Sequence, residues 1–159
     1  MALNDAPEDE ARAILALPHV CGDPKDWEPD NETSWAQSIT CGALTTSGES
    51  SGLLVQALYG HSHKTGKTLY QFTVWRRQLM GRKPYHERVY QLTVKKFKRP
   101  ISDAHALPHE HIGAFRSPGN PEWLRWSFMD AKSYFSRQTN ITFSPDVEDP
   151  EVFRLRHTS

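Results

Sequence analysis

Residues 53–95 read LLVQALYGHSHKTGKTLYQFTVWRRQLMGRKPYHERVYQLTVK and decide the fold. Apolar and polar residues alternate in three runs, which is typical of strands with one buried face. The apolar positions of the three runs are Leu53, Val55, Ala57 and Tyr59; Tyr70, Phe72 and Val74; and Tyr90, Leu92 and Val94. Turn-like residues 61–66 and 81–84 separate the runs, so we expect a three-strand antiparallel meander.

The N-terminal third is expected to be a helix followed by an irregular arm. Asp5 can cap a helix, Pro7 suits its first turn, and Pro18 ends it. Residues 21–51 are rich in Asp, Pro, Thr, Ser and Gly. This composition is typical of irregular structure and leaves room for one short strand near residues 35–44.

The C-terminal part predicts a helix that packs on the sheet. Asn120 can cap this helix and Pro121 suits its first turn. Its apolar stripe would consist of Leu124, Phe128, Ala131 and Phe135. Residues 109–115 predict a short fourth strand and residues 141–143 an edge strand. We therefore expect an α+β fold: a mainly antiparallel sheet of four to five strands, one long C-terminal helix and a short N-terminal helix.

The chain of 159 residues suits a single domain. Its expected parts are the acidic helix and arm (residues 1–51), the sheet and helix core (52–143) and a polar tail (144–159). The sequence has no run of about 18 apolar residues, and its N-terminus is acidic where a secretory signal is basic and then apolar. We expect a soluble, cytoplasmic protein with no membrane partner.

The charges of this neutral chain are strongly segregated. Residues 1–50 hold ten acidic and two basic residues, a net charge of −8. Residues 61–99 hold eleven basic residues and one acidic residue, a net charge of +10. A basic block of this kind attracts polyanions or an acidic protein surface. The alternative is that the acidic block covers the basic block within the same molecule.

The basic block is interleaved with aromatic residues, a combination that suits nucleic acid. The candidate phosphate contacts are Arg76, Arg77, Arg88, Lys95 and Lys96. The interleaved aromatic residues are Tyr59, Tyr70, Trp75, Tyr85 and Tyr90, of which Tyr70 and Tyr90 fall on the predicted core-facing rows. Gly-rich phosphate loops, Gly-x-Ser-x-Gly elbows and His-Glu-x-x-His motifs are absent from the sequence, which argues against large families of cofactor enzymes.

Two histidine pairs are spaced i, i+2, so each pair would share one face of a strand. His61 and His63 fall in a predicted turn, where solvent exposure explains them. His109 and His111 begin the predicted fourth strand. They could be exposed residues without a special role, or a general base and general acid that cleave RNA through its 2′-hydroxyl. A metal site with His105 as third ligand is the remaining alternative.

The segment Pro108-His-Glu-His-Ile-Gly113 follows basic antiparallel strands and precedes a helix. In this respect residues 53–140 resemble small TumE-like toxins of bacterial toxin–antitoxin pairs. The spacing here is Pro-His-x-His, whereas the family pattern has a longer gap or a further histidine. The resemblance implies a small α+β protein that acts on nucleic acid or translation and is held by an acidic partner. His109 and His111 are the positions that map onto it.

We therefore predict a nucleic-acid-directed protein, with RNA as the favoured partner. Within that class the sequence favours a metal-independent ribonuclease of toxin type, with His109 and His111 as catalytic residues and no cofactor. The alternative is a non-enzymatic interaction module, such as an accessory subunit or inhibitor in a bacterial or phage defence system. Its basic face would dock on an acidic protein.

Overall fold

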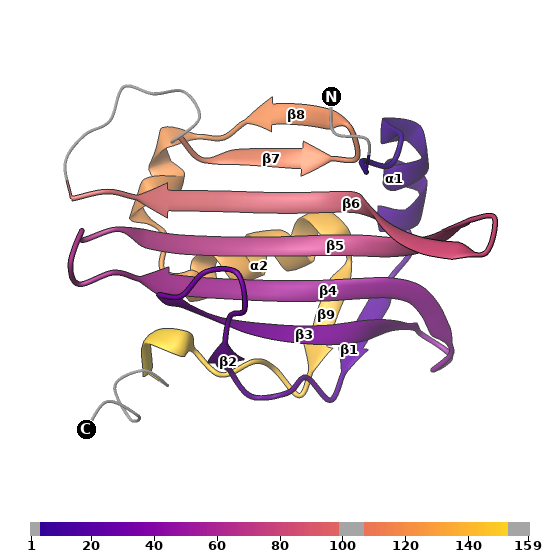
Figure 1. The fold of residues 1–159 in the computed structure, drawn as a ribbon, viewed down its shortest axis with the longest axis horizontal. Helices are drawn as coiled ribbons and strands as arrows, with labels where there is room; N and C mark the ends of the chain where they lie inside the picture. The colour runs from indigo at the N-terminus through magenta and orange to yellow at the C-terminus, as the bar shows by residue number, and fades with distance from the viewer. Residues whose placement is uncertain (1–3, 99–106, 153–159) are drawn as a thin grey trace.

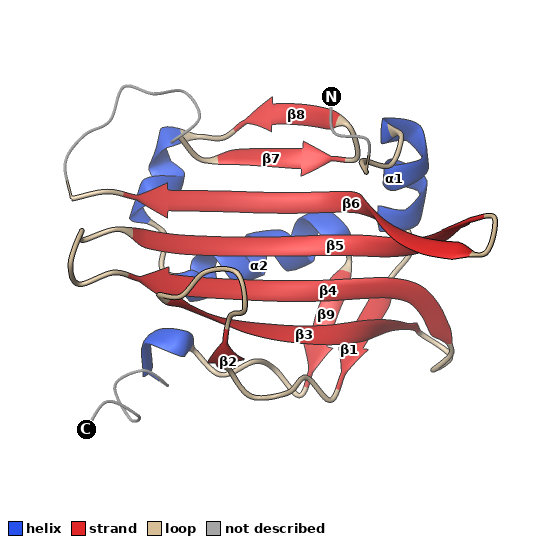
Figure 2. Ribbon diagram, in the orientation of Figure 1, coloured by secondary structure: helices blue, strands red, loops and turns tan. Residues whose placement is uncertain are grey.

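The computed structural model describes residues 4–98 and 107–152, and in this part of the chain nine strands form one sheet (Figure 1). The strands are β1 (His19–Gly22), β2 (Glu28–Pro29), β3 (Ala36–Thr45), β4 (Ser50–His61), β5 (Thr68–Met80), β6 (Lys83–Lys96), β7 (His109–Ile112), β8 (Phe115–Pro118) and β9 (Ile141–Ser144). The helices with both ends in the described residues are α1 (Glu8–Leu15), the 3₁₀ helix η2 (Pro121–Arg125) and α2 (Phe128–Thr139), and residues 150–152 are also helical. Figure 2 shows how far strands predominate over helices.

The strand order is β8-β7-β6-β5-β4-β3-β1-β9, and β2 pairs with β3. Among these strands all pairings are antiparallel except that of β1 with β9. The expected meander is confirmed as β4, β5 and β6, and β5 pairs with β6 from Thr68 to Met80. The strands at the two ends of this order have four residues each; β8 ends at Pro118, and Pro145 follows β9.

The expected fold class is wrong, because the sheet has nine strands and α2 only 12 residues. The expected irregular arm contributes β1 and β2, and the ten-residue β3 lies where the sequence left room for one short strand. Ile39, Cys41 and Ala43 of β3 are buried, whereas Thr40 and Gly42 between them are exposed. A strand with one solvated face needs an apolar residue only at every second position. Small apolar residues fill these positions here and give a weak hydrophobic pattern.

The C-terminal helix begins later than the sequence predicts. The side chain of Asn120 accepts a hydrogen bond from Glu122 N at 2.9 Å, but it caps η2 rather than a long helix. Trp126 then has extended backbone angles, and α2 starts with a capping box of Ser127 and Asp130. As a result Leu124 lies outside the buried stripe and is 37% exposed.

The core lies between the sheet and α2. Phe128 and Phe135 of α2 are fully buried, and their ring centroids lie 5.1 and 5.0 Å from that of Phe72 in β5. Ala11 and Leu15 of the confirmed N-terminal helix α1 belong to the same core. Across the described ranges, none of the helices has the length and apolar character needed to cross a bilayer.

The opposite face of the sheet, which we call the open face, is not covered by α2. In Figure 1 the viewer looks onto this face, with α2 behind β4 and β5. The loop after β2 lies in front of the sheet, where residues 30–33 line a hollow together with residues of β4 and β5. The long central strands therefore have one side that α2 does not cover, although Leu58, Leu69, Thr73 and Thr93 on that side are buried.

Candidate functional site

A row of polar side chains crosses the open face. In the register of β4 to β8, the successive cross-strand partners are Gln56, Thr73, Gln91, His111 and Arg116. Cross-strand partners on one face lie about 5 Å apart, so their polar groups can contact each other. Gln91 Nε2 donates to Thr73 Oγ1 at 3.0 Å. The row continues from the centre of the sheet to its β8 edge.

His109 and His111 lie side by side on β7, with ring centroids 5.2 Å apart and ring planes at 87°. Glu110 points to the helix side, where it accepts a hydrogen bond from the Tyr90 hydroxyl. The predicted alternation of this strand is confirmed. His109 Nδ1 lies 3.0 Å from the Leu107 carbonyl oxygen. Because a carbonyl oxygen can only accept, this nitrogen carries the ring proton.

Arg88 connects this row to the N-terminal segment. Its Nε donates to Asp5 Oδ1 at 2.8 Å and its Nη2 to Asp5 Oδ2 at 3.0 Å. Nη1 donates to Gln91 Oε1 at 2.9 Å, and Nη2 lies 3.3 Å from His111 Nδ1. A guanidinium group only donates, so His111 Nδ1 is the acceptor and its ring proton lies on Nε2. The Arg88 and Asp5 side chains are 16% and 9% exposed, respectively.

A β-bulge in β6 places Arg88 on the open face. The register shifts so that Val74 pairs with Tyr90 and Trp75 with Arg88. Val89 is the extra residue, and it is fully buried in the core. Regular alternation from Tyr90 would have put Arg88 on the helix side. The bulge turns it outward instead, as bulges near functional sites often do.

The chain before α1 runs beside β6 and delivers Asp5 to Arg88. Arg88 N donates to Asn4 O at 2.6 Å, and Ala6 N donates to Arg88 O at 3.0 Å. Gly113, in the turn after β7, has a φ of +57°, and a Cβ there would lie 2.3 Å from Ala6 O. Glycine is therefore required at this position both for its backbone conformation and for the close approach of the N-terminal segment.

The pKa of His111 is lowered to about 4. Burial is the main cause, and the positive charge of Arg88 and the neighbouring His109 add to it. Asp5 opposes the shift, whereas Arg116 contributes slightly to it. His111 is therefore neutral at pH 7, as its role as acceptor from Arg88 requires.

The pKa of His109 is also lowered, mainly by burial. The hydrogen bond to the Leu107 carbonyl opposes this shift, while Arg116, Lys95 and Arg88 add to it. Both histidines thus lie in a positive field that favours their neutral forms. An anion placed between them would reverse that effect, because a negative charge favours imidazolium.

The lowered pKa of His111 predicts that stability falls as the pH decreases from about 6.5 to about 4. In this window the unfolded chain binds a proton at this residue that the folded chain does not. Because the ring is partly exposed, we expect a loss of about 1 kcal/mol relative to His111→Gln. Urea unfolding at several pH values measures it, with His86→Gln, at an exposed histidine, as the control. An NMR titration that places His111 near 6.5 would contradict the prediction.

The structure brings together four of the seven residues predicted from sequence as site residues: Arg88, Lys95, His109 and His111. Arg116 of β8 joins them as the cross-strand partner of His111. The only feature of the sequence that could have identified Arg116 is its place just after the strand that carries His109 and His111. We call Arg88, Lys95, His109, His111 and Arg116 the His–Arg cluster. Lys96 lies on the helix side, where its Nζ donates to the Tyr70 hydroxyl at 3.3 Å and to the Trp126 carbonyl.

Arg76 and Arg77 lie away from the His–Arg cluster. Arg76 forms ion pairs with Glu10 of α1 at 3.4 Å and with Glu87 of β6 at 3.3 Å. Arg77 is exposed on the part of the β5–β6 hairpin beyond the bulge, opposite His86.

The acidic N-terminal block meets the basic block at two points in the described part of the chain. Asp5 pairs with Arg88, and Glu10 pairs with Arg76. Glu8 instead pairs with Arg12 within α1. Masking by the acidic block is therefore local, and in this part of the chain Lys95 and Arg116 have no ion pair with it.

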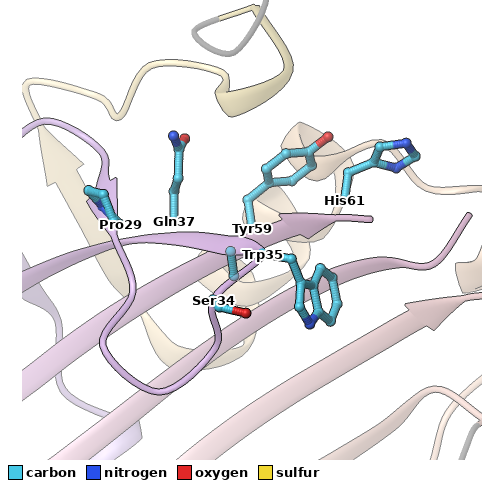
Figure 3. A pocket seen from close by; sticks show the side chains of 7 residues that line it. Pro29, Ser34, Trp35, Gln37, Tyr59 and His61 are labelled. Atoms are coloured by element: carbon cyan, nitrogen blue, oxygen red, sulfur yellow. The ribbon is translucent and has the colours of Figure 1, made fainter. Parts of the chain in front are cut away.

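A separate hollow of about 240 Å³ lies at the end of β3 and β4. In Figure 3, Gln37, Tyr59 and His61 point to one side of these strands and Trp35 to the other. The Oε1 atom of Gln37 is buried here, with no hydrogen-bond partner in the described part of the chain. His61 and its neighbour His63 thus lie at a different place from the His–Arg cluster.

One other sequence hypothesis concerns a metal site. In residues 4–98 and 107–152, no three His, Cys, Asp or Glu side chains are arranged to hold a metal ion. His105, the proposed third ligand, lies outside the described residues. Cys21 and Cys41 are buried free thiols on neighbouring strands.

Comparisons with known proteins give no independent guide: no family model, curated protein or solved structure matches this chain. Function must therefore be inferred from the geometry of the open face.

Proposed function

We propose that the open face binds the phosphate backbone of RNA at the His–Arg cluster. The observation that carries the proposal is the convergence of Arg88, Lys95, Arg116 and two imidazoles on three adjacent strands. Arg and Lys side chains are the usual ligands of nucleic-acid phosphates. A bound phosphate would raise the pKa of both histidines and so recruit further positive charge.

RNA cleavage is a second candidate function, and the tautomer of His109 favours it. His109 carries its proton on Nδ1, so its Nε2 has a free lone pair; His111 carries its proton on Nε2. In the proposed reaction, His109 Nε2 takes the proton of a 2′-hydroxyl, and the 2′-oxygen attacks phosphorus. The bond from phosphorus to the 5′-oxygen breaks, and that oxygen takes a proton from Nε2 of His111. For this step the bound phosphate must first draw Arg88 Nη2 away from His111 Nδ1, so that the imidazolium can form. A 2′,3′-cyclic phosphate and a 5′-hydroxyl result.

The binding proposal predicts a steep salt dependence. Contacts from Lys95 and Arg116 to two phosphates give an expected slope of log affinity against log salt of about −1.4 for a single strand. Arg88 is not counted, because Asp5 already neutralises it. Fluorescence anisotropy with labelled single-stranded RNA measures it. Arg116→Gln is expected to weaken binding and to reduce the slope by about 0.7. Arg137→Gln is the matched control, because Arg137 is exposed on α2, on the covered side of the sheet.

Absence of RNA binding at low salt would overturn the proposal and favour the non-enzymatic interaction module. The same samples, kept in a metal chelator and analysed on gels, test cleavage. Ribonuclease action requires cleaved RNA, intact DNA of the same sequence and no cleavage by His109→Gln. Intact RNA in all samples would reject the cleavage step and leave the binding proposal standing.

A further inference from the structure

Trp75 differs from the other tryptophans of the chain in its surroundings. Trp27 is 4% exposed and donates to the Glu148 carbonyl, and Trp123 and Trp126 stack on each other with centroids 4.9 Å apart. Trp75 is half-buried on β5 and points to the open face, where its cross-strand partners are Leu54 and Arg88. In the described part of the chain, its indole has neither a ring partner nor a hydrogen-bond partner.

The indole lies between two hollows of the open face. One has a volume of about 300 Å³ and is formed by the loop at residues 30–33 together with Gln56, Leu58, Gln71 and Trp75. The other, of about 360 Å³, is lined by Asn4, Leu54, Trp75 and His86. Trp75 belongs to both linings, so a planar group that enters either hollow meets the aromatic ring.

The first hollow has the chemistry of a base-binding site rather than a phosphate site. Its lining contains the amide side chains of Asn31, Gln56 and Gln71 and the carboxylate of Glu32, but no Lys or Arg. The Asp30 carboxylate accepts from the backbone N–H groups of residues 32 and 33 and so holds the loop in place. Amides can bond both the amino and the carbonyl groups of a base, and carboxylates can accept from its amino groups, whereas a carboxylate beside a phosphate would repel it.

We propose that Trp75 stacks on an unpaired base of the RNA whose phosphates bind the His–Arg cluster. This inference rests on the proposed function and adds that the bound RNA is single-stranded. Trp75 lies one strand from Arg88 and two strands from His111, and adjacent strands are about 4.8 Å apart. One extended nucleotide chain can therefore reach both sites. A base within a duplex cannot stack on the indole without leaving its partner, so the protein selects single strands.

The test compares wild type, Trp75→Ala and Trp75→Phe with single-stranded oligoadenylate and with inorganic polyphosphate, which has no bases. Trp75→Ala is expected to weaken oligoadenylate binding about tenfold, while Trp75→Phe retains most of the affinity. Polyphosphate binding is expected to be unchanged in both variants. Oligoadenylate should also quench tryptophan fluorescence in wild type, and Trp75→Phe should reduce that quenching.

The outcomes separate the two proposals. If wild type binds oligoadenylate and Trp75→Ala binds it equally well, the stacking inference is wrong and phosphate binding stands. Equal affinity of wild type for oligoadenylate and its duplex with oligouridylate would also overturn the inference. If wild type binds neither oligoadenylate nor polyphosphate, the proposed function itself fails. A loss of polyphosphate binding in both Trp75 variants would show a structural role for the ring.

Discussion

Arg88→Met is expected to lower the free energy of unfolding by about 3 kcal/mol at pH 7. The substitution leaves the Asp5 carboxylate, whose side chain is 9% exposed, without the two hydrogen bonds of the guanidinium. It also removes the donors to Gln91 and His111. Urea unfolding of the full chain measures the loss, and RNA binding should weaken in the same variant.

A double variant tests whether the loss of stability comes from the unpaired charge of Asp5 or from a general packing defect. Asp5→Asn combined with Arg88→Met is expected to be more stable than Arg88→Met alone, because no charge is then left unpaired. Arg77→Met changes an exposed arginine on the same hairpin and should alter stability by at most about 0.5 kcal/mol. A loss below about 1 kcal/mol for Arg88→Met would contradict the prediction, because unpaired buried charges cost more than that.

Phe128→Ala is expected to cost about 4 kcal/mol of unfolding free energy. The side chain is fully buried in the first turn of α2. Its ring centroid lies 5.3 Å from that of Trp27, 5.9 Å from that of Tyr70 and 5.1 Å from that of Phe72. Removal of the ring therefore opens a cavity between α2, β5 and the segment before β2. Denaturant unfolding followed by tryptophan fluorescence measures the change.

Phe115→Ala is the matched control for this variant. Phe115 is 43% exposed on the β8 edge and should lose less than about 1 kcal/mol. A Phe128→Ala protein that still folds at low temperature should keep its RNA affinity, because the ring lies on the face opposite the His–Arg cluster. Similar losses for the two variants would contradict the packing described for α2.

The fold was predictable where the hydrophobic pattern is strong. Alternating large apolar residues identify β4, β5 and β6, and acidic residues before an apolar stripe identify α1. The same argument indicated only a short strand where the ten-residue β3 lies, since Cys41 and Ala43 carry little hydrophobic signal. It also failed for the start of α2, where Asn120 and Ser127 are both good caps and only tertiary packing separates η2 from α2.

The candidate site was predictable only in part, for a geometric reason. The i, i+2 spacing of His109 and His111 correctly implies a shared face. Strict alternation in β6, however, groups Val89 with Gln91, whereas the bulge buries Val89 and turns Arg88 to the open face. Bulges depend on local backbone pairing and are not evident from periodicity.

The contacts of Asp5 and Arg116 depend on which strands become neighbours. Asp5 is 83 residues from Arg88 in sequence, and no local pattern relates the two. The charge pattern predicts only a general attraction between the acidic and basic blocks. The structure shows which acidic residue pairs with which basic residue.

The short, proline-bounded edges of the sheet have a consequence for solubility at high concentration. Long alternating strands such as β5 and β6 would add readily to another chain if they lay at an edge. The strand order ends in β8, whose last residue is Pro118, and in β9, which Pro145 follows. Residues 77–80 of β5 and 83–87 of β6 extend beyond the outer neighbours of their hairpin. Proline has no N–H to donate to an incoming strand, and a strand of four residues offers an incoming strand few backbone hydrogen-bond partners. The two ends of the strand order are thus poor templates for an incoming strand, and the tip of the β5–β6 hairpin is the longer open edge.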